Sequence, residues 1–177
     1  MSANNYTIDA AHSNVKFWVR HFGISRVHGT FSGVSGTVSY DPANPEATVV
    51  EASIDVSTVN TGVADRDGHL KSPDFFDVAT YPTFTFKSKS VTKVEDGEFK
   101  VTGDLTLHGV TKEVTFDAEV SEEVKSPFNT YKVGASLSGK IAREDFGLTY
   151  NQVLEAGGLA IGKDVHIDLD IEFDRPL

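Results

Sequence analysis

The chain has 177 residues, no cysteine and a formal net charge of -10. The absence of cysteine excludes disulfides, thiol nucleophiles and thiolate metal sites, and the negative charge argues against a nucleic-acid partner because it repels phosphates. With 39% hydrophobic residues and no low-complexity linker, residues 1–177 are expected to form a single domain.

Two further features concern membranes and localisation. No apolar run is long enough for a membrane-spanning helix, so we expect no integral membrane segment. The start MSANNYTIDA lacks the basic and apolar stretches of a secretory signal. We therefore expect a cytoplasmic protein, with a periplasmic or secreted location as the alternative if the chain is a processed form.

The first predicted strands lie in residues 9–31, DAAHSNVKFWVRHFGISRVHGTF. Side chains of a strand point alternately to opposite faces, which places one apolar set together: Val15, Phe17, Val19 and His21. On that face, His21 could bind a ligand head group, act as an acid or base near neutral pH, or be a core histidine bonded to a backbone carbonyl.

Asp9, His12 and Ser13 contain the residue types of a catalytic triad. A triad needs the base aimed at the nucleophile, whereas adjacent strand residues such as His12 and Ser13 point to opposite faces. We therefore expect an Asx-type turn that opens a strand and no catalytic residue. None of the six histidines has a recognised metal-ligand spacing, so no metal site is expected either.

Residues 64–82, ADRDGHLKSPDFFDVATYP, interrupt the alternation and predict a short helical segment near residues 64–78. Its charged residues, Asp65 to Lys71, lie next to Phe75 and Phe76. The charges could bind a polar head group while the two rings touch an apolar chain. They could also pair among themselves and anchor the helix across one end of the fold, and the two interpretations are compatible.

From residue 84 onward the alternation resumes. Turns are predicted at Asp96-Gly97 and at His108-Gly109, while residues 151–162 are expected to form a loop over one end. The final run, VHIDLDIEFD, has one apolar and one acidic face. Together these patterns predict an all-β protein, an antiparallel barrel or a sandwich of about eight strands.

The residues on the apolar faces favour a barrel. The chain has 12 phenylalanines, and glycines lie in or beside the alternating runs, where they allow bends and close approaches. The interior of a small antiparallel barrel is either filled by side chains or able to hold one small ligand.

Four segments carry a resemblance to a known family: residues 9–31, residues 66–88, GDLTLHGVTKEV at residues 103–114 and IAREDFGL at residues 141–148. From about Tyr6 to Phe173 the chain resembles the YceI-like family of polyisoprenoid-binding, lipocalin-like proteins. The resemblance implies an extended antiparallel β-barrel whose lumen holds a long amphiphile, such as an isoprenoid quinone precursor, a polyprenyl chain or a fatty-acid derivative. It also implies no shared catalytic residue set, no cofactor other than a bound lipid, and a homodimer.

The expected ligand-binding residues are the inward-facing apolar residues and those near the mouth: Val15, Phe17, Val19, His21, Phe31, Phe75, Phe76, Phe84, Phe86, Leu105, Leu107, Ile141 and Phe146. Candidates for head-group contact are Arg66, His69 and Arg143. Two alternatives remain open. One is an enzyme that uses His21 or the Asp65–His69 cluster, and the other is a stress-protective structural protein with a filled core.

Overall fold

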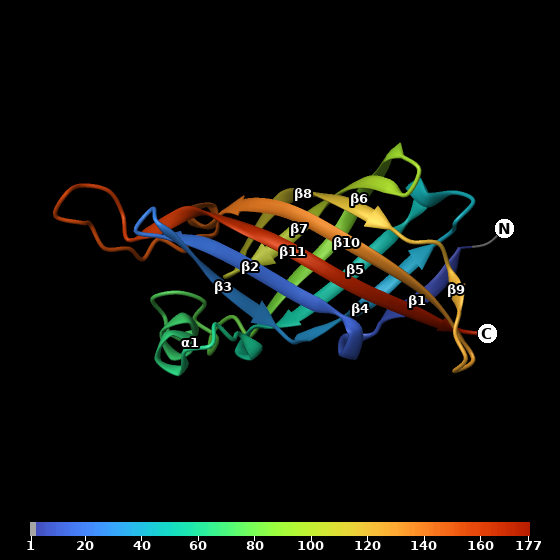
Figure 1. Cartoon of the computed structure of the whole chain (residues 1–177), viewed down its shortest axis with the longest axis horizontal. Helices are drawn as coiled ribbons and strands as arrows, with labels where there is room; N and C mark the ends of the chain where they lie inside the picture. The colour runs from blue at the N-terminus through green and yellow to red at the C-terminus, as the bar shows by residue number, and fades with distance from the viewer. Residues whose placement is uncertain (1–2) are drawn as a thin grey trace.

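The computed structural model describes residues 3–177, and its strands form one continuous antiparallel sheet (Figure 1). The predicted domain 1–177 thus includes two residues, 1 and 2, that lie outside the described range. The strands are β1 (Asn4–Ile8), β2 (Asn14–His21), β3 (Ser25–Phe31), β4 (Gly33–Tyr40), β5 (Val49–Asp55), β6 (Thr83–Glu95), β7 (Glu98–Leu107), β8 (Val110–Val120), β9 (Val124–Lys125), β10 (Thr130–Ala142) and β11 (Ile161–Pro176).

The sheet closes on itself because β10 pairs with β11 along its whole length, from Thr130 opposite Pro176 to Ala142 opposite Asp164. β1 and β2 pair one after the other with the same side of β11, so they act as one kinked strand. In the same way β3 pairs with β2 and β4 pairs with β1, so β3 and β4 form the next kinked strand of the barrel. The result is a closed barrel of 8 antiparallel strands, the one of the two predicted architectures that the apolar faces favoured, which confirms the predicted fold class.

The kinks and turns follow local chemistry. A 3-10 helix, η1 (Ala10–His12), separates β1 from β2, and the Asp9 side chain caps it by accepting from the Ala11 amide. Both predicted hairpin turns are present. Gly97 has φ +79°, and His108 and Gly109 have φ values of +53° and +72°, the left-handed region that a tight hairpin uses.

Further short 3-10 helices are η2 (Pro45–Ala47), η3 (Val56–Thr58) and η4 (Arg143–Phe146). The one α-helix among residues 3–177, α1 (Ala64–Lys71), is shorter than the helical segment predicted near residues 64–78. It ends before Ser72-Pro73, because a proline disfavours helical geometry in the residue before it, and turns follow to Thr80. Within the described range no helix is long and apolar enough to cross a membrane.

The helix and the loop that precedes β11 lie at the same end of the barrel, opposite the two chain termini (Figure 1). Their rings meet there, since Tyr150 of the loop lies 5.0 Å from His69 of α1, centroid to centroid. This end is called the α1 end below.

Glycines let large rings lie against the barrel wall. A Cβ at Gly29 would stand 2.2 Å from Cζ of Phe17 on the paired strand, and one at Gly139 would stand 2.6 Å from Cδ1 of Phe116. Each ring therefore occupies the space of the missing side chain. The close approaches expected at glycine are present at these two positions.

Candidate functional site

The barrel contains a cavity of about 540 Å³. That volume lies within the range of roughly 300–1,000 Å³ typical of small-molecule pockets. The cavity wall runs from Tyr40 and Phe173 near one end of the barrel to His21 and Tyr150 near the other. The cavity favours a barrel that holds a ligand over a barrel filled by its own side chains.

Most of the predicted site residues line this cavity. They are Val15, Phe17, Val19, His21, Phe31, Phe75, Phe76, Phe84, Phe86, Leu105, Leu107 and Ile141, together with the head-group candidates Arg66, His69 and Arg143. Phe146, expected at the mouth, is not among the lining residues. Its ring is only 2% exposed and packs within the main hydrophobic cluster, because η4 turns it into the wall.

Several inward-facing side chains are only half-buried. Phe17, Phe86 and Leu105 have intermediate exposure although they face the lumen. The inner wall near α1 is held by packed rings, since the Phe31, Phe76 and Phe84 centroids lie 5.3 to 5.8 Å apart. These distances are those of favourable aromatic pairs, so this part of the wall is rigid and apolar.

The end of the barrel away from α1 is packed shut by aromatic residues. Tyr6 is 1% exposed, and its ring lies edge-on to Phe173 at 5.3 Å. The Tyr6 hydroxyl donates to Glu123, and Arg175 bridges both groups at 3.1 to 3.2 Å. Burial raises the pKa of the Tyr6 hydroxyl, so it remains protonated and donates at neutral pH.

At the α1 end the wall carries polar groups. Arg66 donates to the Thr61 hydroxyl at 2.7 Å and to the Thr61 carbonyl at 2.9 Å. Asp67 accepts from the amide and the hydroxyl of the same threonine at 2.7 and 2.6 Å, and these bonds lower the pKa of its carboxyl. His69 pairs with Asp74 at 2.9 Å. These bonds tie the helix to the residues directly before and after it, whereas the self-pairing interpretation had the charged residues pairing with one another. Arg66 and His69 also line the cavity.

Arg143 is buried at 4% exposure between η4 and the loop before β11. Its guanidinium donates to four backbone carbonyls, those of Gly162, Leu148, Tyr150 and Ile161, at 2.6 to 3.5 Å. Burial lowers the pKa of this side chain. Arg143 therefore ties the loop to the barrel as well as lining the cavity.

The triad residue types do not form a triad. The Ser13 hydroxyl donates to the Glu172 carbonyl at 3.3 Å and accepts from the Glu172 amide at 3.0 Å, across the kink between β1 and β2. His12 instead contacts Asp9, Nδ1 to Oδ2, at 2.7 Å. In residues 3–177 no histidine is hydrogen-bonded to Ser13, which agrees with the expected turn.

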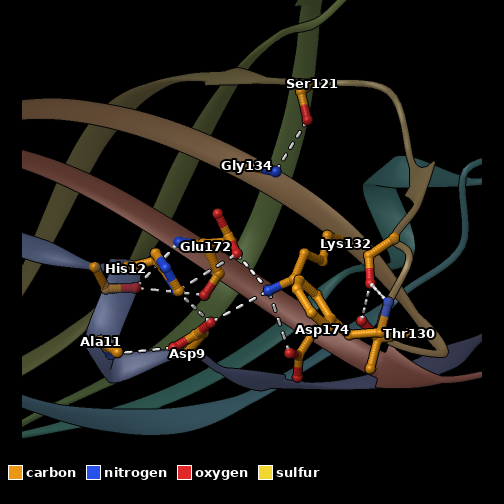
Figure 2. A network of polar contacts seen from close by, with 12 residues as sticks. Asp9, Ala11, His12, Ser121, Thr130, Lys132, Gly134, Glu172 and Asp174 are labelled. Atoms are coloured by element: carbon orange, nitrogen blue, oxygen red, sulfur yellow. Dashed lines mark hydrogen bonds and ion pairs between the residues drawn. The ribbon is translucent and has the colours of Figure 1, made fainter.

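Figure 2 shows this polar network on the outside of the barrel. Asp9, His12 and Glu172 bring three potential metal-ligand atoms within 4.8 Å of one another. The Lys132 ammonium already lies among the carboxylates, 2.5 Å from Glu172, 3.2 Å from Asp9 and 3.5 Å from Asp174. The cluster is therefore an ion-pair network around lysine.

The His12–Asp9 contact predicts a pH effect. Hydrogen bonding to His12 lowers the pKa of Asp9 to about 2, and the same bond raises the pKa of His12 above 6.5. The stabilisation from His12 is then full below pH 6.5 and is lost as pH rises through the raised value, whereas that from Asp9 is lost as pH falls toward 2.

We expect an NMR titration of the His12 ring to give a pKa above 6.5, and Asp9→Asn to lower it. The His166 ring, stacked on Trp18 away from this network, is the internal control, and its NMR signals at a fixed pH should coincide in the two proteins. A His12 pKa that does not change in the variant would contradict the assigned pair.

Comparison with known proteins identifies the family. The model of the YceI-like domain matches residues 6–173, nearly the whole chain. The chain belongs to the YceI-like family. A UPF0312 protein of Staphylococcus aureus strain N315 is 41% identical over 170 residues, which cover 96% of each chain, and one from strain MSSA476 is 40% identical over the same coverage.

Solved structures of the YceI-like fold superpose well. The Campylobacter jejuni YceI protein is 34% identical with a TM-score of 0.76, covering 89% of this chain and 90% of its own. BcnA of Burkholderia cenocepacia, at 24% identity, has a TM-score of 0.80 over 93% and 98% of the two chains. A polyisoprenoid-binding domain from Saccharophagus degradans, at 21% identity, reaches 0.69 over 99% and 100%. The last two support the fold alone.

Some lining residues of this YceI-like protein were not predicted from its sequence. At the α1 end they include Thr61, Tyr150, Gln152 and Ala160. They belong to segments without alternation, so no periodicity indicates which way their side chains point. For Gln152 and Ala160 there was one indication in the sequence, since residues 151–162 were expected to form a loop over one end of the barrel.

Proposed function

We propose that this protein binds a long amphiphilic lipid in the barrel lumen and sequesters or carries it. The observation that carries the proposal is the apolar cavity of about 540 Å³ inside a barrel packed shut at one end. The candidate ligands are an isoprenoid quinone precursor, a polyprenyl chain or a fatty-acid derivative. The proposal is in line with the description of the Saccharophagus degradans structure as a polyisoprenoid-binding domain.

Apolar walls suffice for such binding. Transfer of each methylene from water to an apolar site is worth about 0.8 kcal/mol, so a chain of about 15 carbons gains on the order of 10 kcal/mol before the costs of association. No covalent step is needed. The half-buried wall residues Phe17, Phe86 and Leu105 are the ones whose exposed area a ligand would cover.

The enzyme alternative relies on His21 or on the Asp65–His69 cluster. The cluster's best-placed groups are engaged locally, Asp67 with Thr61 and His69 with Asp74. His21 lines the cavity beside Phe22, with ring centroids 3.9 Å apart. We therefore propose binding without chemistry, and a ligand recovered unchanged after long incubation is the expected result.

The test is uptake of offered lipid. Native mass spectrometry of protein mixed with a polyprenyl alcohol or a fatty acid should show one added ligand mass, and extraction should return the compound intact. Protein that takes up neither class would refute lipid binding. A returned compound with an altered mass would favour the enzyme instead.

Transport and self-association extend the proposal. A carrier should release its lipid to acceptor vesicles, which a transfer assay with separated donor and acceptor vesicles measures. The homodimer expected from the family resemblance is tested by analytical ultracentrifugation of the protein with and without lipid. A purely monomeric sedimentation profile in both states would remove the homodimer from the proposal.

A further inference from the structure

The charged residues that line the cavity are all basic. The whole chain has 26 acidic residues against 16 lysines and arginines, yet no aspartate or glutamate of the described residues contributes to the cavity wall. The basic lining residues are Lys16, Arg20, Arg66 and Arg143, with His21 and His69 beside them. The charged residues that contribute to the wall thus have the sign opposite to the net charge of the protein.

Two of these cations already have partners on the outer face. Lys16 pairs with Asp170 at 3.5 Å, and Arg20 lies 5.6 Å from the Trp18 ring centre, on the side of β2 that faces away from the lumen. Arg66 and Arg143 differ. In residues 3–177 neither forms an ion pair with a carboxylate, whereas Arg175 at the packed end pairs with Glu123 at 3.1 Å.

Arg143 is the stronger case because it is buried. A guanidinium has five N–H donors, and the four contacts of Arg143 all go to backbone carbonyls, the longest at 3.5 Å. Carbonyl dipoles satisfy hydrogen bonds without neutralising the charge. Glu144, the next residue, favours the Arg143 charge through space, but its carboxylate pairs with Lys163 at 3.6 Å and forms no ion pair with Arg143. A buried cation that is not paired directly with a carboxylate is costly, and an anion brought into the cavity would offset that cost.

Arg66 lies at the same end of the cavity. It precedes His69 by three residues on α1, so the two side chains share a helix face. The His69 ring contacts the Tyr150 ring, and the Tyr150 carbonyl accepts from Arg143. Arg66 and Arg143 are therefore linked through His69 and Tyr150 at the same end of the cavity. Asp67 accepts from Thr61 and Asp74 pairs with His69, and neither aspartate lines the cavity.

From this charge pattern we infer that the ligand is an amphiphile with an anionic head group, a carboxylate or a phosphate, held at the α1 end by Arg66 and Arg143. Its apolar tail then points toward Phe173 at the packed end. This inference rests on the proposed lipid binding and specifies its ligand. The cavity would reject a cationic head group because no carboxylate is there to receive it.

The experiment compares head groups on one chain by isothermal titration calorimetry at neutral pH. The probes are dodecanoate, dodecyl phosphate and dodecan-1-ol. A hydrogen bond between two charged groups is stronger than one to a neutral hydroxyl, so the better anion should bind at least about tenfold more tightly than the alcohol. If the alcohol binds as tightly as both anions, the anionic head group is refuted while lipid binding stands. If none of the three binds, lipid binding itself fails.

A substitution assigns the effect to its residue. Arg66→Gln removes the charge but keeps a group that can donate to Thr61, and it should reduce the preference for the anion about three- to tenfold. Affinity for dodecan-1-ol should fall by less than affinity for the anion. Arg66→Gln is chosen because Arg143 also holds the loop, so its replacement would disturb the fold. The matched control, Lys100→Gln, removes one positive charge from the outer wall, where Lys100 pairs with Asp117. An equal loss of preference in both variants would overturn the assignment to Arg66.

Discussion

Leu105→Trp is expected to weaken lipid binding at least about tenfold while leaving the thermal midpoint within a few degrees of the parent. Leu105 lines the cavity from β7 and is half-buried because its side chain borders the lumen. The indole ring would therefore occupy ligand space. Overpacking a filled core costs about 1–3 kcal/mol, but here the added atoms meet a void. Calorimetric titration with a fatty acid measures the first effect, and thermal unfolding followed by circular dichroism measures the second.

The control for this substitution is Thr85→Trp. Thr85 is exposed on the outer face of β6, where it pairs with Ser53 of β5 and Thr106 of β7. The same ring placed there should leave lipid affinity unchanged. A large loss of stability in Leu105→Trp with unchanged lipid affinity would instead describe a barrel whose lumen is filled.

Phe146→Ala should give the largest loss of stability. The ring is 2% exposed and surrounded by core residues, and truncation of such a buried phenylalanine costs about 3–5 kcal/mol. Phe86→Ala should cost about half as much, because one side of the Phe86 ring borders the cavity and has few contacts to lose. Urea unfolding of the two variants beside the parent measures both values.

The contrast between the two rings is the informative quantity. Both residues are phenylalanines of the barrel wall, so the two substitutions remove the same atoms. Equal losses of the free energy of unfolding would mean that Phe86 is as well packed as Phe146. The cavity beside it would then be closed in solution.

The barrel itself could be predicted because strand geometry imposes a period of two. Phe84 and Phe86, or Leu105 and Leu107, had to point to one face, and that face is the lumen. The turns at Gly97 and Gly109 followed from their need for positive φ. Local rules of this kind act between near neighbours, so a single sequence reveals them.

The end of the cavity could be predicted only in part. Arg66 and His69 were identified as head-group candidates, but the contact of His69 with Tyr150 joins residues 81 positions apart and has no local signal. Phe146 was misplaced for the same reason. A ring after a strand can face the lumen or the wall, and the turn of η4, with Gly147 in the left-handed region, decides which.

The central claim is that the lumen holds a lipid, and the most direct measurement is mass spectrometry of the organic extract of gently purified protein. The account predicts an apolar chain with an acidic head group, present in about equal molar amount to the protein and clearly reduced in the extract of Leu105→Trp. Extracts of parent and variant that contain the same compounds in the same amounts, or none, would contradict it.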